Sequence, residues 1–239
     1  MKKTILILLL IASSAVVAQA QTIIPKIGLS VSSTNGELET PGFSNSISSC
    51  TGFTIGLGYN YPLGTVGRGI FSVQPELSFI QKGFNGKTSG EINIGEAIYQ
   101  LVADQQYKIN YLELPVLAKI EFGSAKTKFS FLAGPSIGYG LGGKLKGKYT
   151  LDDGYDTWKE NIDGKIKFGK EPSNAEEDFD VVYFDNRLDV GLNLGAGVTL
   201  YNKIAIDVRY QLSFTNLSDD ADSANRVLQF TVGVPLSLK

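Results

Sequence analysis

Residues 203–214 read Lys-Ile-Ala-Ile-Asp-Val-Arg-Tyr-Gln-Leu-Ser-Phe and alternate between two kinds of side chain over their whole length. The even positions, from Ile204 to Phe214, are all apolar, whereas the odd positions, from Lys203 to Ser213, are polar, charged or small. Successive side chains of a β-strand point to opposite faces of the sheet. The stretch is therefore predicted to be a strand with one apolar and one polar face.

The same period of two recurs along the chain. Residues 187–200 and 228–239 repeat it with few defects, so three long strands are predicted to close the chain. Five further candidates lie upstream with more defects: Pro25–Ser33, Thr51–Tyr61, Gly69–Gln81, Tyr107–Phe122 and Thr127–Leu141. An even total of eight strands fits an all-β, closed, antiparallel up-and-down barrel.

Two local features predict departures from regular pairing. Within residues 107–122 the apolar positions change from odd, ending at Tyr111, to even, beginning at Leu112, which predicts a bulge near Tyr111. Proline removes a donor from the ladder, so irregular pairing is also expected at Pro75, Pro115, Pro135 and Pro235.

The links between the eight strands alternate in length. Short links are expected at 62–68, 123–126 and 201–202, and longer links elsewhere, the largest from Gly142 to about Phe184. All long links then fall on one rim and all short turns on the other, together with both ends of the barrel. This parity is typical of an outer-membrane barrel with short periplasmic turns and long extracellular loops.

Aromatic residues gather near both predicted rims, as aromatic girdles at two lipid–water interfaces do. The group near the short turns is Tyr59, Tyr61, Phe71, Phe122, Phe129 and Tyr201; the group near the long loops is Phe79, Tyr107, Tyr139, Tyr210 and Phe214.

Residues 1–20 have the three parts of a secretory signal peptide: Lys2 and Lys3, the apolar run 5–11, and the small-residue site Ala18-Gln19-Ala20. An uncleaved membrane helix is the alternative, but the apolar run is short for a span of about 20 residues. Cleavage would leave residues 21–239 as the barrel domain. Because Gln21 and not cysteine would follow the cut, no lipid anchor is expected there.

Composition narrows the function classes. Residues 21–239 contain 20 basic and 24 acidic residues, and this balance indicates no nucleic-acid partner. The chain has a single cysteine, Cys50, which excludes an intramolecular disulfide. It has no histidine, which excludes Ser-His-Asp and Cys-His chemistry and histidine metal ligands. We expect no catalytic, cofactor-binding or metal-binding residues, no cofactor, and no enzymatic activity.

Several motifs resemble the PorT-type outer-membrane β-barrel family of Bacteroidota over essentially the whole chain after residue 20. They are Tyr111-Leu112-Glu113-Leu114-Pro115, Gly134-Pro135, Gly138-Tyr139, the glycine-rich run 189–197, and Asp207-Val208-Arg209-Tyr210. The resemblance implies an outer-membrane location and a barrel fold, with a role in secretion for some members.

The polar faces of the predicted strands carry seven charged side chains: Glu76, Glu113, Lys119, Glu121, Asp189, Asp207 and Arg209. If the apolar face meets lipid, these charges point into a narrow lumen, where they must pair or be hydrated. A salt-bridged plug is the favoured interpretation, since an eight-stranded barrel is filled by side chains. A proton or ion path is the alternative.

Other candidates lie in the predicted long loops. The acidic residues Asp152, Asp153, Asp156, Glu176, Glu177, Asp178 and Asp180 could hold a cation, but their spacing does not match a calcium loop, so a solvated acidic loop is favoured. Trp158, near Tyr155, could stack on a ligand; packing within the loop is favoured. Cys50 is placed at the end of the first long loop, where it would be open to reagents, and an intermolecular disulfide is the alternative role.

Together these features predict a non-enzymatic outer-membrane barrel with an envelope-structural or surface-interaction role. Its expected partners are outer-membrane lipid and lipopolysaccharide, the barrel-assembly machinery, and an extracellular or envelope protein. A soluble exported lipocalin-like barrel that carries an apolar ligand is an alternative, because alternation does not say which face is inside. A narrow pore is another alternative.

Overall fold

The computed structural model describes residues 21–36, 42–94, 97–170, 181–219 and 222–238. The predicted signal peptide, residues 1–20, lies outside the described residues. Within the described part of the chain, no helix has the length and apolar character needed to span a membrane.

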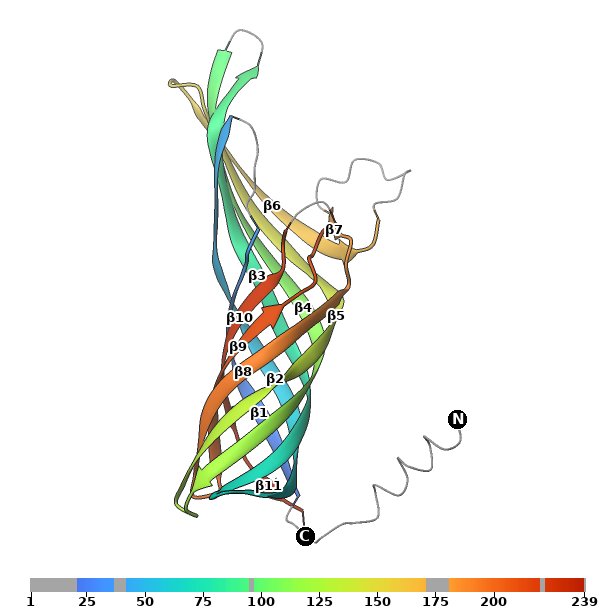
Figure 1. The fold of residues 1–239 in the computed structure, drawn as a ribbon. Helices are drawn as coiled ribbons and strands as arrows, with labels where there is room; N and C mark the ends of the chain where they lie inside the picture. Colours follow the sequence, from blue (N-terminus) through green and yellow to red (C-terminus); the bar gives the residue numbers. More distant parts are fainter. Residues whose placement is uncertain (1–20, 37–41, 95–96, 171–180, 220–221, 239) are drawn as a thin grey trace, which may run out of the picture.

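Eight antiparallel strands close into a barrel (Figure 1). Each strand pairs with the next around the ring, and the last pairs with the first, so the predicted eight-stranded barrel is confirmed. In ring order the strands are β1 (Thr22–Thr34), β2 (Phe43–Val66), β3 (Gly69–Ile94), β4 (Ala97–Gly123), β5 (Thr127–Asp152), β8 (Leu188–Leu200), β9 (Ile204–Ser213) and β10 (Asn225–Gly233).

The two faces of each strand have opposite environments. In β9 the apolar residues Ile206, Val208 and Tyr210 are about 40% exposed on the outside, whereas Asp207 and Arg209 are each 4% exposed inside. Apolar side chains therefore surround the barrel and polar side chains fill it, which is the arrangement of a membrane barrel. A lipocalin-like carrier needs the reverse, so that alternative is wrong.

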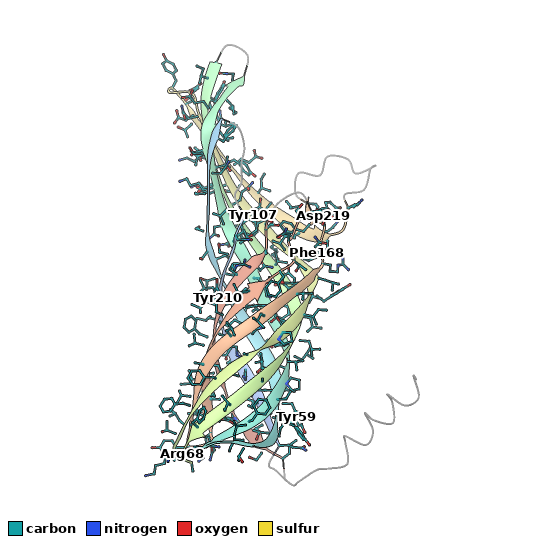
Figure 2. The ribbon with its side chains drawn as sticks, viewed as in Figure 1. Tyr59, Arg68, Tyr107, Phe168, Tyr210 and Asp219 are labelled. Atoms are coloured by element: carbon teal, nitrogen blue, oxygen red, sulfur yellow. The ribbon has the colours of Figure 1, made fainter. Side chains whose placement is uncertain are left out.

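The short turns fall where the alternation predicts. β2 and β3 are joined by Gly67-Arg68, β4 and β5 by residues 124–126, and β8 and β9 by residues 201–203. Tyr201 and Asn202 both have positive φ, near 50°, which is the backbone that a tight hairpin turn of this handedness requires. These periplasmic turns lie at the lower end in Figure 2, where Arg68 and Tyr59 are labelled.

The opposite end differs from the prediction, because much of the expected loop is paired strand. β3 and β4 pair to their shared tip at Ile94 and Ala97, and β5 continues to Asp152, where it meets β6 (Thr157–Phe168). β7 (Val181–Phe184) then pairs with β6 in parallel. These strands rise beyond the barrel as one sheet, whose top is the β3–β4 hairpin (Figure 1). Sequence reasoning missed these strands although part of the stretch alternates: residues 161–168 read Asn-Ile-Asp-Gly-Lys-Ile-Lys-Phe, and Ile166 is 2% exposed on the inner face.

The predicted bulge is real in position but lies on the neighbouring strand. Asn110 pairs with Gly142 and Tyr111 with Gly140, so the extra residue is Leu141 of β5. β4 itself stays in phase: Ile109 and Tyr111 face the interior. The apolar residues at odd positions of β4 are thus a buried cluster, not a displaced lipid face.

Pairing is interrupted at the prolines, as predicted. β10 ends at Gly233 before Pro235, and the chain resumes as β11 (Leu236–Ser237), which pairs with β1. The β3–β4 ladder is likewise broken after Pro75, where the next pair is Ser78 with Glu113.

Candidate functional site

Four charged side chains from three strands form an ion network across the lumen, with each side chain 4–7% exposed. The Lys26 ammonium lies 2.8 Å from Glu76 Oε1 and 2.8 Å from Asp207 Oδ2. Arg209 donates to both carboxylate oxygens of Glu76, at 2.6 and 2.8 Å, and its Nη2 lies 3.2 Å from Asp207. Two cations are therefore balanced by two carboxylates.

A second network lies farther from the short turns. Lys82, 1% exposed, is 2.6 Å from Glu113 Oε2 and 3.0 Å from Asp189 Oδ2. Asn225 donates to the same Asp189 oxygen at 3.1 Å. The ring of Tyr111 covers the ammonium, with its centroid 5.1 Å from Nζ, as in a cation–π contact.

The periplasmic end of the lumen is partly open. A cavity of about 430 Å³ begins at the short turns and is lined by residues such as Asn60, Lys128 and Asn202. Lys119 and Glu121 form its charged inner wall and pair with each other at 3.4 Å.

An apolar cap, defined here as the buried cluster above Lys82, closes the extracellular end. Its buried members come from the barrel, from β6 and from the loop before β10: Ile80, Phe84, Ile109, Tyr111, Leu145, Ile166, Leu217 and Val227. Phe184 of β7 and Tyr107 pack against this cluster. Tyr107 stacks on Phe84 with ring centroids 4.6 Å apart. Figure 2 shows Tyr107 and Phe168 at the level where the sheet leaves the barrel.

The structure places all seven predicted polar-face residues inside the barrel, each at most 9% exposed and in one of these ion pairs. Sequence reasoning missed two cations, Lys26 and Lys82. Lys26 shares a strand with the outward-facing Ile27 and Leu29, so strict alternation along β1 was a usable signal. Lys82 lay one residue beyond the expected end of its strand at Gln81.

Most of the predicted girdle residues lie on the outside. The prediction for Tyr107 is wrong, because this side chain packs against the apolar cap. Tyr139, Tyr210 and Phe214 are 46%, 43% and 68% exposed near the extracellular rim. Phe129 and Tyr201, 60% and 67% exposed, lie near the short turns.

The loop candidates have structural partners. Asp153 accepts hydrogen bonds from the backbone N–H groups of Asp156 and Tyr155, at 2.7 and 2.9 Å, and these bonds lower the pKa of its carboxyl group. Asp152 accepts in the same turn from Gly154. The predicted acidic residues 176–178 and Asp180 lie outside the described residues. Within the described part, no group of three acidic or cysteine side chains could hold a metal ion.

Trp158 and Cys50 are also placed by strand pairing. Trp158 packs against Tyr99 of β4, with ring centroids 5.9 Å apart. Cys50 lies inside β2 and is 2% exposed, so the expectation of an accessible loop thiol is wrong. β2 begins at Phe43 and not at Thr51, so Cys50 is a strand residue, and its side chain faces inward.

Above the cap, the outer face of the sheet carries a polar groove of about 710 Å³. Register aligns two transverse rows of side chains across β2 to β6. One row is Ser48, Asn85, Gln106, Lys146 and Asp163, and the next is Ser46, Lys87, Asp104, Lys148 and Asn161. Gln106 donates to Asn85 at 3.1 Å, and Lys87 lies 3.9 Å from Asp104.

The fold and its inside-out polarity define a class, the outer-membrane β-barrels. Residues 18–219 match the model of the outer membrane protein beta-barrel domain family, and the chain belongs to that family. It is an outer-membrane protein.

Several solved outer-membrane proteins are similar in fold. Ail of Yersinia pestis, solved with the heparin analogue sucrose octasulfate, is 14% identical, with 91% of this chain and 99% of that chain covered and a TM-score of 0.39. The outer membrane enzyme PagL is 13% identical, with 88% and 99% covered and a TM-score of 0.44. Neisserial surface protein A is 9% identical, with 92% and 100% covered and a TM-score of 0.36. No curated protein matches the chain.

Proposed function

We propose that this protein is a non-enzymatic surface-interaction barrel, which holds a polar sheet above the outer membrane for an extracellular or envelope protein to bind. The observation that carries the proposal is the combination of a filled lumen with a sheet that continues far beyond it. The ion networks and the apolar cap occupy the space that a channel would need. The extended strands, in contrast, leave two rows of polar side chains in open water.

The groove has the chemistry of a recognition surface. Its side chains offer both amide donors and acceptors and both signs of charge, and complementary charged and polar groups across an interface give specificity. Its backbone is fixed, because the strands that carry the rows pair with their neighbours. A preformed backbone loses little conformational entropy when a partner binds.

A photo-crosslinking residue tests the proposal in intact cells. We expect a probe at Asn161 or Asn85, in the groove, to form an adduct with an envelope or extracellular protein. The matched control places the same probe at Asn202, in a periplasmic turn, and its adducts should differ. If both groove positions form no adduct while the barrel is assembled, the surface-interaction role is refuted.

A second test addresses the pore alternative. The purified barrel in a planar bilayer should show no steady large conductance. Reproducible open-channel steps that vanish without the protein would favour a pore.

Three finer assignments are part of the proposal. The PorT-type affiliation, with its link to secretion, is supported by the motifs around Glu113 and Asp207. Cleavage after Ala20 is supported by the signal-like pattern of residues 1–20. Use of the barrel-assembly machinery is supported by family membership.

A further inference from the structure

Three lysines stand side by side on the outer face of the sheet, just below the polar groove. Lys108 of β4 pairs with Lys144 of β5, and Lys144 pairs with Lys165 of β6. Directly opposed residues on adjacent strands have Cβ atoms roughly 5 Å apart. We call Lys108, Lys144 and Lys165 the lysine row. Lys146 and Lys167 follow it on the same face, two residues along their strands.

This arrangement is unfavourable for the isolated protein. Like charges directly opposite each other destabilise a sheet. Among the ion pairs between described residues, none includes a member of the row. The contrast with the lumen is clear, because there every cation of the networks has a carboxylate within 4 Å. The row is therefore a patch of three cations on the outer face with no carboxylate of a described residue within 4 Å, and such a patch attracts external anions.

The row lies at the height of the outer-leaflet headgroups. The apolar outer face of β4 ends at Leu112 and that of β5 at Leu141, which are 43% and 55% exposed. Farther up their strands, Lys108 lies four residues from Leu112 and Lys144 lies three residues from Leu141. With a rise of about 3.3 Å per residue and a strand tilt of about 40°, this places them roughly 8–10 Å above the last apolar residues. Lysine stems can reach down from there into a headgroup layer that is about 5–8 Å thick.

We propose that the lysine row binds the phosphate groups of an outer-leaflet glycolipid, that is, the phosphorylated headgroup of lipopolysaccharide. The proposal goes beyond the partner-binding role of the groove and does not depend on it. A phosphorylated headgroup carries several anionic oxygens, which three parallel ammonium groups can share. Its acyl chains would lie against the outward apolar residues below, such as Leu112 and Leu141, so one molecule satisfies both parts of the surface.

The test compares two triple variants in detergent with purified lipopolysaccharide as the probe. One variant is Lys108→Gln/Lys144→Gln/Lys165→Gln. The control, Lys126→Gln/Lys159→Gln/Lys203→Gln, removes the same charge at exposed sites away from the row. Bound lipopolysaccharide is counted by native mass spectrometry at several concentrations. We expect the row variant to bind about a hundred-fold more weakly than the parent, since each basic side chain near an anionic surface contributes about a factor of five. The control should bind within about a factor of five of the parent.

Thermal unfolding separates binding from misfolding. Without lipopolysaccharide, the row variant should be at least as stable as the parent, because repulsion within the row is removed. With lipopolysaccharide, only the parent and the control should gain stability. Equal gains in all three proteins would overturn the proposal.

Two further probes identify the source of the phosphate. Chemically dephosphorylated lipopolysaccharide should bind the parent as weakly as the intact form binds the row variant. Free inorganic phosphate at millimolar concentration should not displace the intact lipid. If free phosphate displaces it completely, or if the dephosphorylated lipid binds normally, the lipid-phosphate assignment is wrong.

Discussion

Removing the negative charge of Glu76 should strongly destabilise the barrel. Its carboxylate is 2.8 Å from Lys26 and takes two hydrogen bonds from Arg209, at 2.6 and 2.8 Å, in a site that is 4% exposed. Glu76→Gln keeps the shape of the side chain but leaves two cations facing one carboxylate, Asp207. Loss of one partner from a buried ion pair costs about 3–5 kcal/mol, because the remaining charge has neither water nor a counterion.

The assay is urea unfolding of the barrel in lipid vesicles, followed by the gel shift between folded and unfolded protein. Glu160→Gln is the matched control, since the same chemical change on exposed β6 should alter the free energy of unfolding by less than about 0.5 kcal/mol. The double variant Glu76→Gln/Arg209→Gln restores the charge balance between Lys26 and Asp207. It should be more stable than Glu76→Gln alone, and the coupling of the two substitutions should be about 1–3 kcal/mol.

Two results would refute this reasoning. If Glu76→Gln unfolds like the Glu160→Gln control, the lumen is wet enough to solvate an unpaired cation. If the effects of the two substitutions simply add, Glu76 and Arg209 do not act as a pair.

Three further perturbations test other parts of the structure. Val208→Arg puts a charge on the lipid face and should cost about 2–4 kcal/mol near the midplane, whereas Val208→Leu should unfold at the parent's urea concentration. Cys50 should resist a thiol reagent until the barrel is unfolded; labelling of the folded protein would contradict its burial. The Asp185 carboxylate accepts from the backbone N–H of Asp219 and the hydroxyl of Ser218, and these bonds lower its pKa. This contact is present above the ordinary aspartate pKa of about 4 and is lost as the pH falls through the lowered value, so the amide NMR signal of Asp219 should shift only in acid.

The strand pattern made the barrel predictable from local sequence. Twelve alternating residues around Val208 and Asp207, repeated in seven other segments, imply two-faced strands whatever the rest of the chain does. The short turns could also be predicted from local sequence, because Tyr201-Asn202 interrupts the alternation between β8 and β9. The even number of strands and the alternating lengths of the links then predicted a closed barrel whose long links lie on one rim.

The height of the sheet could not be predicted in the same way. Above the membrane only some inner positions are buried: Ala103 is 6% exposed, whereas its partner Thr88 is partly exposed, so the alternation there is weaker than in the barrel. Likewise the odd apolar positions of β4 suggested a bulge at Tyr111, whereas the added residue is Leu141 on the partner strand.

What only the tertiary structure decided is which residues meet. Alternation by itself determined that one face is apolar and the other polar, but closure of the ring decided that the polar face is inside, where Lys26 meets Asp207 across 181 positions of sequence. The register between strands likewise decided that Lys108, Lys144 and Lys165 lie side by side. The physical reason is that period two is a property of one strand, whereas pairing partners and the height of each side chain depend on all the strands of the closed sheet.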